Sequence, residues 1–210
     1  MSGTFIVFEG CEGAGKSTQM RLLSELLQKR GAAHTVTREP GGSEISEAIR
    51  KVILDGRFTA MTDECEALLY AAARAQHRAD TVAPALARGE IVLCDRYIFS
   101  SYAYQGAGRG LPRKFLEEIN GYAVSNYMPD LALFLDIPPA QAFDRKHGVD
   151  EDDRMECAGE GFHARVYAGY KRMLAEFPET FVAVDCSGTK FETNAKIAAM
   201  LEERGLIPRA

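Results

Sequence analysis

The stretch Gly10-Cys11-Glu12-Gly13-Ala14-Gly15-Lys16-Ser17 decides how the rest of the chain is interpreted. It follows a short apolar run, Phe5–Phe8, and it precedes a segment whose apolar residues recur at helical spacing. Glycines let several backbone N–H groups turn toward one point, and the helix that follows adds the partial positive charge of its N-terminus. A strand, a glycine-rich turn and a helix in this order are typical of a phosphate-binding loop.

Two side chains at the end of this stretch indicate what the loop holds. Lys16 can reach the β- and γ-phosphates of a nucleoside triphosphate, and the Ser17 hydroxyl can ligate Mg²⁺. Such a loop predicts a triphosphate but not a reaction, so GTPases, motor-type ATPases and nucleotide or nucleoside kinases all stay open. GTPases read guanine with an Asn-Lys-x-Asp stretch, and the sequence has no such tetrapeptide.

Outside this loop, short apolar runs alternate with longer amphipathic segments. Strands are expected at Phe5–Phe8, His34–Thr37, Ile91–Cys94, Leu131–Leu135 and Phe181–Val184. Helices are expected from about Ser43 to Leu54 and from Asp63 into the 70s, with a second helical stretch to Arg88, and further helices over 113–126, 139–147, 160–176 and 191–204. Apolar strands separated by helices are typical of a parallel sheet covered on both faces. We therefore expect a single α/β domain over 1–210, a three-layer sandwich with about five parallel strands.

Composition narrows the class of partner. The chain has 210 residues with 25 Lys and Arg against 30 Asp and Glu, a formal net charge of −5. A general nucleic-acid coat needs a basic surplus, so an anionic ligand must be held by a local basic cluster. Five cysteines without Cys-x-x-Cys spacing favour neither a disulfide framework nor a zinc site, and they predict a reduced, cytosolic chain. Neither a signal peptide nor a membrane span is expected.

Two neighbouring residues suggest the type of reaction. Asp95 ends an apolar strand, where it can orient Mg²⁺ through water, and Arg96 comes next to it. A carboxylate on the metal side with an adjacent guanidinium suggests that a second phosphate group meets the first. This combination favours phosphoryl transfer to an anionic acceptor. Segment 148–159 is polar and lacks an apolar period, and its residues fit a solvated loop and a lid over the phosphate site equally well.

Several further motifs resemble one known family. They are Arg38–Gly42, Leu68–His77, Asp95–Gly106, the pair Asp153-Arg154, and Phe162–Val166 followed by Gly169-Tyr170. In this order they are similar to bacterial thymidylate kinases, and the resemblance covers Thr4 to about Leu201. It implies the P-loop nucleoside monophosphate kinase fold with a small lid at about 145–160. It also implies ATP-dependent conversion of dTMP to dTDP in dTTP synthesis, Mg²⁺ dependence, a cytoplasmic location and a homodimer.

The resemblance assigns the donor side of the site. ATP binding falls to Gly10, Cys11, Glu12, Gly13, Ala14, Gly15, Lys16, Ser17, Thr18 and Arg145, with Ser17 and Asp95 at the metal. Lys16, Asp95, Arg96 and Arg154 are the implied catalytic residues. Adenine is expected near Ser187, Gly188 and Thr189, after the last strand.

The chain departs from some family members at position 13, where Gly stands in place of a catalytic arginine in the loop. A lid arginine or lysine must then stabilise the transferring charge, and Arg145, Lys146 and Arg154 are the candidates. Arg154 is preferred because it lies in the matching Asp-Arg pair. The lid is also acidic, with four carboxylates in a row at 150–153.

The acceptor site is implied in the same way. Arg38 and Arg96 would clamp the phosphate of dTMP, because guanidinium presents paired donors to phosphate oxygens. Tyr70 would stack on thymine, and Arg74, one turn along the same helix, would lie on the Tyr70 face and bind the base. The remaining contacts are Ser101 and Gln105 at the polar base edge, Tyr104 against the 2′ position of the sugar, and Glu12 at the 3′-hydroxyl.

Purely structural roles for these residues stay open. Arg38 could pair with Glu39 or Glu44, and Arg74 could pair with Glu66 or Asp80 on the surface. Rival functions are a kinase of another pyrimidine nucleotide or of a deoxynucleoside, and a regulatory protein that binds nucleotide without turnover. The paired arginines argue for an acceptor that already carries a phosphate, and intact Lys16 argues against the regulator.

Overall fold

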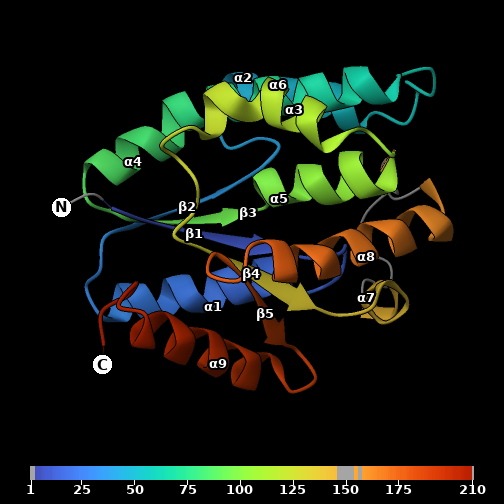
Figure 1. The fold of residues 1–210 in the computed structure, drawn as a ribbon. Helices are drawn as coiled ribbons and strands as arrows, with labels where there is room; N and C mark the ends of the chain where they lie inside the picture. Colours follow the sequence, from blue (N-terminus) through green and yellow to red (C-terminus); the bar gives the residue numbers. More distant parts are fainter. Residues whose placement is uncertain (1–2, 146–153, 156–157, 210) are drawn as a thin grey trace.

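The sheet sets the frame of the molecule. The computed structural model describes residues 3–145, 154–155 and 158–209, with the backbone alone for 143–145. Five strands, β1 (Thr4–Glu9), β2 (His34–Arg38), β3 (Ile91–Asp95), β4 (Leu131–Asp136) and β5 (Phe181–Asp185), pair in the order β2-β3-β1-β4-β5. All four pairings are parallel, as expected (Figure 1). Most of the segment expected as a lid, 145–160, falls outside the described residues.

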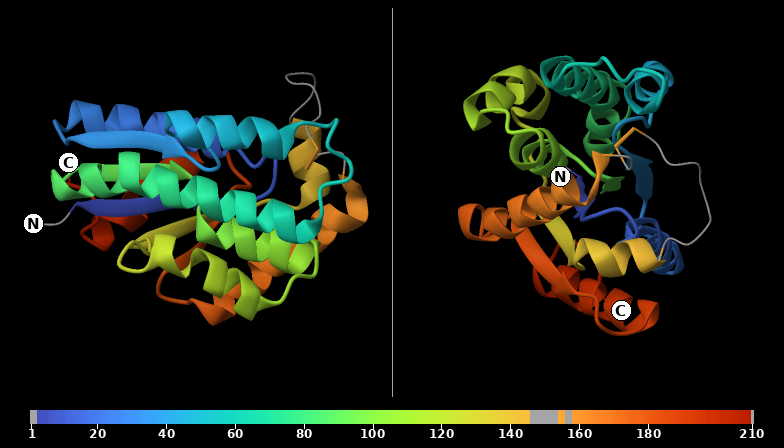
Figure 2. Two further views of the ribbon diagram at one scale, coloured as in Figure 1. Left: turned by 90° about the horizontal axis from the view of Figure 1, so that it is seen from above. Right: turned by 90° about the vertical axis from the view of Figure 1, so that its right-hand side faces the viewer.

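Alternate side chains of each strand enter two separate cores. Phe5 and Val7 of β1 lie in one core, and Ile6 and Phe8 lie in the other. This alternation is the period of two that a strand imposes, and it requires helices on both faces. The three-layer α/β sandwich predicted from the sequence is therefore confirmed (Figures 1 and 2).

Helices cover the two faces unequally. One face packs against α1 (Lys16–Lys29), α7 (Pro139–Arg145) and α9 (Lys190–Glu203). The other packs against α4 (Ala83–Ala87), α5 (Ile98–Ser101), the π-helical segment η2 (Tyr102–Gly108) and α8 (Glu160–Glu176). Beyond these lie α2 (Glu44–Leu54), α3 (Asp63–His77) and α6 (Arg113–Val124), at the top of Figure 1. The helical layer on this second face is therefore the thicker of the two.

Two π-helical segments differ from the expected helices. The helix expected from Asp63 into the 70s is α3, the second helical stretch expected up to Arg88 contains α4, and the π turn η1 (Arg78–Val82) joins the two. Residues 98–108, for which no helix was predicted, form α5 and η2. A π-helix bonds residue i to i+5, which leaves no familiar period in the sequence, and such segments are frequent at functional sites.

The carboxyl ends of the central strands bring the motif residues to one edge. In the register of the sheet, Phe8 of β1 and Arg38 of β2 both lie beside Asp95 of β3. Parallel sheets of this kind bind ligands at this edge, where neighbouring loops diverge. The right panel of Figure 2 looks onto it.

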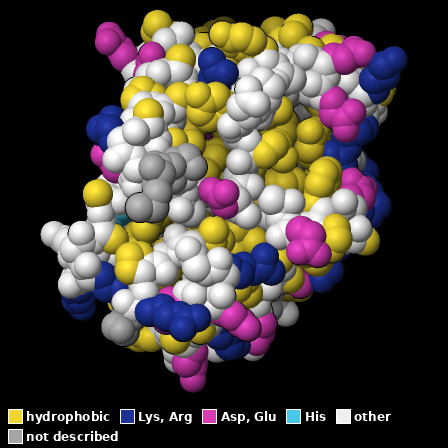
Figure 3. Space-filling model, turned by 60° about the vertical axis from the view of Figure 1, so that its left-hand side comes forward, with side chains coloured by type: hydrophobic (Ala, Val, Ile, Leu, Met, Phe, Trp, Pro, Cys, Tyr) yellow, Lys and Arg dark blue, Asp and Glu magenta, His cyan; other side chains and the backbone are white. Residues whose placement is uncertain are grey.

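The surface is of mixed charge on the face drawn in Figure 3, where both signs are interspersed among apolar side chains. No broad basic area lies on that face, in line with the net charge of −5. Among the described helices, none has the length and apolar character needed to cross a membrane.

Candidate active site

The phosphate-binding loop connects β1 to α1 and packs tightly against α7. Gly13 has φ +74°, and a Cβ at this position would lie 2.1 Å from the backbone oxygen of Ala142. Any side chain here would strain the backbone and push α7 away from the loop. The absence of a loop arginine at position 13 therefore has a steric reason in this chain.

Lys16 begins α1 and folds over its own loop. Its Nζ donates to the backbone oxygens of Gly10, at 3.3 Å, and Cys11, at 3.0 Å, and the residue is 6% exposed. The ammonium thus lies at the centre of the loop, with neutral carbonyl partners that an anionic phosphate can replace. Cys11 is a buried filler, because burial raises the pKa of its thiol to about 11.

Ser17 and Asp95 lie close together at the mouth of the loop. The Ser17 Oγ is 3.4 Å from Asp95 Oδ2, and Asp95 Oδ1 is buried without a hydrogen-bond partner among the described residues. A buried carboxylate oxygen without a donor fits a cation or its water. In the described part of the chain no cluster of three or more His, Cys, Asp or Glu could hold a metal alone. This pair therefore suits Mg²⁺ that takes its other ligands from phosphates and water.

Arg96 follows Asp95 in a strained backbone conformation. Its φ is +68°, in the left-handed region that residues with a side chain seldom adopt. The side chain turns back to the phosphate loop, where Nη1 donates to the Gly10 oxygen at 3.0 Å and Nη2 pairs with Glu12. The guanidinium also lies 5.0 Å from the centre of the Tyr104 ring. Strain of this kind, of about 1–3 kcal/mol, is typical of functional positions.

Glu9 is a site residue that the sequence analysis missed. It is fully buried and accepts hydrogen bonds from the Tyr97 N–H at 2.9 Å, the Ser100 Oγ at 2.6 Å and the Tyr170 hydroxyl at 2.9 Å. Burial raises the pKa of its carboxyl, which those hydrogen bonds partly offset. These bonds hold the segment that carries Arg96. The sequence offered one signal for Glu9, namely an acidic residue at the end of an apolar strand, directly before the phosphate-binding loop.

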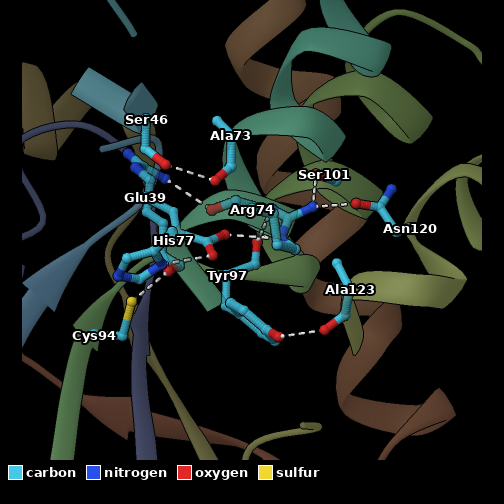
Figure 4. A network of polar contacts seen from close by, with 12 residues as sticks. Glu39, Ser46, Ala73, Arg74, His77, Cys94, Tyr97, Ser101, Asn120 and Ala123 are labelled. Carbon is cyan, nitrogen blue, oxygen red and sulfur yellow. Dashed lines mark hydrogen bonds and ion pairs between the residues drawn. The ribbon is translucent and has the colours of Figure 1, made fainter. Parts of the chain in front are cut away.

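Arg74 is buried at the centre of a polar network (Figure 4). Its Nε donates to Glu39 at 2.7 Å, its Nη1 donates to Ser101 at 3.0 Å and to Asn120, and its Nη2 donates to the Tyr97 oxygen at 3.0 Å. A guanidinium has five N–H groups, so these four bonds leave one N–H on Nη2 for a ligand. Arg74 is therefore neither a surface arginine nor a partner of Glu66.

The guanidinium of Arg74 lies over the ring of Tyr97, 5.3 Å from its centre. Stacking of Arg74 on Tyr70 stays a prediction. Tyr70 itself is half-buried, one turn before Arg74 on α3. His77, one turn further, is fully buried and joins the network by bonding Glu39 at 3.0 Å.

The π-helical segment η2 presents Tyr104 and Gln105. The Tyr104 hydroxyl is buried and has no hydrogen-bond partner in the part of the chain that the structure describes. Burial raises the pKa of this phenol, so it is a neutral group with an unused donor. The Gln105 Nε2 donates to Glu66 at 2.8 Å, and both residues are buried. A second site residue that the sequence analysis did not assign is thus Glu66.

Two arginines expected in the site pair with carboxylates elsewhere. Arg38, at the end of β2, contacts both oxygens of Glu47, at 2.9 and 3.0 Å, and its side chain is half exposed. Neither Glu39 nor Glu44 is the partner of Arg38. Arg154 donates to Glu66 at 2.5 Å and to the Ile53 oxygen at 3.0 Å, which places it beside the Gln105 partner rather than over the phosphate loop.

The remaining predicted donor-side residues are only partly described. Arg145 ends α7, and its side chain lies outside the described residues, as do Lys146 and the acidic run at 150–153. Thr189 caps α9, accepting from the Glu192 N–H at 3.2 Å in a reciprocal capping box. Ser187 turns back to Asp185 through its backbone N–H, at 3.0 Å. Adenine binding at 187–189 stays a prediction.

Comparisons with known proteins agree with this geometry. A family model described as "Thymidylate kinase" matches residues 8–197. The chain is 47% identical to the thymidylate kinase of Bacillus velezensis over 192 residues, which cover 90% of this chain and 91% of the relative. It is 47% identical to that of Desulforudis audaxviator over 212 residues, covering 97% and 94%. The solved thymidylate kinase of Ehrlichia chaffeensis superposes with a TM-score of 0.79 at 25% identity, covering 96% of this chain and 100% of that one.

Proposed function

The chain belongs to the thymidylate kinase family, and we propose that the residues gathered around its phosphate-binding loop perform the family's reaction. The protein is a phosphotransferase that converts dTMP to dTDP, and the family implies ATP as the donor. An oxygen of the dTMP phosphate attacks the γ-phosphorus of ATP, the bond to the β-phosphate oxygen breaks, and ADP leaves. Catalysis of such a transfer rests on positioning and charge stabilisation.

On the donor side, the phosphate loop would hold the β- and γ-phosphates of ATP. Lys16 would exchange its two carbonyl partners in the loop for phosphate oxygens, which restores the ammonium's hydrogen bonds and adds charge pairing. Ser17 and Asp95 would hold Mg²⁺, which neutralises charge on the phosphates when it is bound. Arg154 would serve the transferring group only after leaving Glu66, so its catalytic role depends on a rearrangement.

On the acceptor side, one observation carries the proposal. Arg96 lies directly on the phosphate loop, bonded to the Gly10 oxygen, so its guanidinium can hold the dTMP phosphate next to the γ-phosphate. Arg38 comes from the neighbouring strand in register with Asp95 and can join it. Glu12, now paired with Arg96, would turn to the 3′-hydroxyl when phosphate takes its place.

The base and sugar would be read by groups on α3, α5 and η2. Tyr70 would stack on thymine, for which an aromatic face is worth about 1–3 kcal/mol. The free N–H of Arg74, the Ser101 hydroxyl and the Gln105 amide would meet the polar edge of the base. Tyr104, with its unused hydroxyl, would face the sugar.

Replacing Lys16 tests the donor side. Lys16→Ala should lose most of the ADP release with dTMP while its far-UV circular dichroism and melting transition stay close to wild type, because the ammonium stabilises charge that grows in the transition state. Lys29→Ala, at the other end of the same helix, is the matched control and should retain activity. Near-normal turnover by a folded Lys16→Ala enzyme would refute the assignment.

We also infer a homodimer that packs through α2 and α3. Apolar residues at helical spacing are exposed on both helices: Ile45 and Val52 on α2, and Cys65, Leu68 and Ala72 on α3. A contiguous apolar stripe across two packed helices is unusual on a monomer surface. A cytoplasmic location is proposed with it, because Cys11, Cys65 and Cys94 are free thiols.

Light scattering after gel filtration tests the dimer. Leu68→Glu should shift the protein toward monomer, whereas Phe191→Glu, at an exposed apolar residue on α9, should not. A monomeric wild type at micromolar concentration, or an unchanged mass for Leu68→Glu, would contradict this interface.

A further inference from the structure

The Glu66 carboxylate is a buried junction between α3, η2 with the adjoining Arg109, and Arg154. Its side chain has no exposure to solvent. One oxygen, Oε1, accepts from Gln105 Nε2 at 2.8 Å and, at 3.4 Å, from Arg109 Nε. The other, Oε2, accepts from Arg109 Nη2 at 3.0 Å and Arg154 Nη2 at 2.5 Å. Burying a carboxylate has a large free-energy cost, which the hydrogen bonds from two arginines and one amide offset here.

These contacts determine which way the Gln105 amide faces. Arginine is a donor only, so the two guanidinium groups use the carboxylate as an acceptor. A carboxylate that accepts on both oxygens requires the amide nitrogen of Gln105, not its oxygen, on the Glu66 side. The acceptor Oε1 of Gln105 and the second N–H donor of Nε2 then occupy fixed positions, which a ligand meets in one arrangement only.

That arrangement matters because thymine and cytosine carry inverted patterns on the same edge. Thymine offers an N3–H donor next to the O4 acceptor, whereas cytosine offers an N3 acceptor next to an amino donor. A glutamine amide that can rotate by half a turn satisfies either base, since rotation exchanges its oxygen and nitrogen. An amide held in one orientation fits one base and places like groups against the other.

We propose that Glu66 is a specificity-determining positioning residue, which locks the Gln105 amide in the orientation that accepts thymine and rejects cytosine. The proposal rests on the proposed contact between Gln105 and the base. Glu66 touches no substrate, and its effect on the choice of base is exerted through Gln105. Arg74, a donor aimed at the same edge, adds its own discrimination, so loss of the lock weakens the preference without abolishing it.

The substitution Glu66→Gln reverses the lock at almost constant volume. The two arginines need an acceptor, so the new amide turns its oxygen to them and its NH₂ to Gln105. Gln105 must then turn its own oxygen toward residue 66 and its NH₂ toward the base, which is the arrangement that suits cytosine. The expected change is therefore directional, and a general loosening of the site would not produce it.

Steady-state kinetics with matched acceptors tests this. dTMP and 5-methyl-dCMP differ only at the edge in question, and dUMP shares the edge of dTMP. In Glu66→Gln the ratio of kcat/KM for dTMP to that for 5-methyl-dCMP should fall about tenfold or more, while the ratio for dTMP to dUMP stays as in wild type. Arg109→Gln, which removes one ion pair of Glu66 but keeps the bond to Gln105, is the matched control and should preserve both ratios.

Two outcomes separate this inference from the function on which it rests. If Gln105→Leu leaves the ratio of dTMP to 5-methyl-dCMP unchanged, then Gln105 does not read the base and that part of the proposed function fails. If Gln105→Leu lowers the ratio but Glu66→Gln does not, or if Arg109→Gln lowers it equally, the lock alone is overturned.

A spectroscopic measurement covers the case in which Glu66→Gln fails to fold. In wild-type enzyme with ¹⁵N-labelled glutamine, one Nε2 proton of Gln105 should be shifted downfield and exchange slowly with solvent, and Gln105→Leu assigns the signal by its loss. In Glu66→Asp, whose shorter carboxylate retracts from Gln105, that proton should return toward the position of a free amide. A Gln105 amide with averaged, rapidly exchanging protons in the wild type would overturn the proposal.

Discussion

Arg74 and Arg38 are both assigned to dTMP, but their removal should affect stability very differently. Arg74 and its partner Glu39 are 2% and 3% exposed at their side chains, and their Nε to Oε2 distance is 2.7 Å. In Arg74→Ala the Glu39 carboxylate would keep, among the residues that the structure describes, only His77 as a side-chain partner. Breaking a buried pair by removing one member typically costs about 3–5 kcal/mol, because the other charge stays buried.

Arg38 and Glu47 form the matched control, since their side chains are 54% and 36% exposed. Exposed pairs contribute about 0–1 kcal/mol, because water replaces the lost partner. For a chain of this size each kcal/mol moves the melting temperature by about 2–4 °C. Arg74→Ala should therefore melt roughly 6–20 °C below wild type, and Arg38→Ala within about 4 °C of it.

Thermal and urea denaturation of the ligand-free proteins measure both effects. The double variant Arg74→Met with Glu39→Gln removes both charges and should recover part of the loss seen in Arg74→Ala, because no uncompensated charge is left. The reasoning is refuted if Arg74→Ala is no less stable than Arg38→Ala. It is refuted equally if the double variant is less stable than the sum of the two single changes.

Three smaller predictions concern the loop and its surroundings. Burial raises the pKa of Glu9 in the folded protein, so the native state holds the carboxyl proton more tightly than the unfolded state does. The free energy of unfolding of the wild type, measured in urea, should therefore fall relative to that of Glu9→Gln as pH rises from about 4.5 to 8. A difference that stays constant with pH would contradict this. Alkylation by iodoacetamide at pH 8, followed by mass spectrometry, should modify exposed Cys65 well before buried Cys11, whose pKa is raised to about 11. Gly13→Ala should destabilise the protein by at least 1 kcal/mol more than Gly31→Ala, since both have positive φ but only the first meets backbone at 2.1 Å; equal melting temperatures would contradict the clash.

The frame of the fold was predictable because its signals are local. Each strand is a short apolar run, and the spacing of the glycines, Lys16 and Ser17 identifies the phosphate loop. The five strands and the parallel sheet could therefore be predicted from the residues. The segment 98–108 was not predictable in this way. Its π-helical turns are fixed by packing against α8, where Gly169 allows the Ala107 methyl group to approach.

The site shows the same division. Lys16, Ser17 and Asp95 sit where their motif placed them, because each lies within a residue or two of a strand or helix end. The partners of Arg38 and Arg74 could not be read from sequence. Glu47 and Glu39 are two of many carboxylates, and only the tertiary arrangement of β2, α2 and α3 selects them.

Buried carboxylates were the least predictable part of the site. Glu9 and Glu66 carry no motif, and an acidic residue is normally placed on the surface by default. Both are fully buried, and each holds a segment with a side chain that we assign to the substrate, Arg96 beside Glu9 and Gln105 beside Glu66. Their roles emerge only when the donors around them are known.

The most direct test of the central claim is a comparison of ADP release by the wild-type enzyme with dTMP and with thymidine as acceptors. Arg96 on the phosphate loop and Arg38 beside it are assigned to a phosphate that the acceptor already carries. The expected result is efficient turnover of dTMP, none above background with thymidine, and loss of most dTMP turnover in Arg96→Ala. If thymidine is the better acceptor, or if Arg96→Ala turns over dTMP as wild type does, the assignment of the acceptor site is wrong.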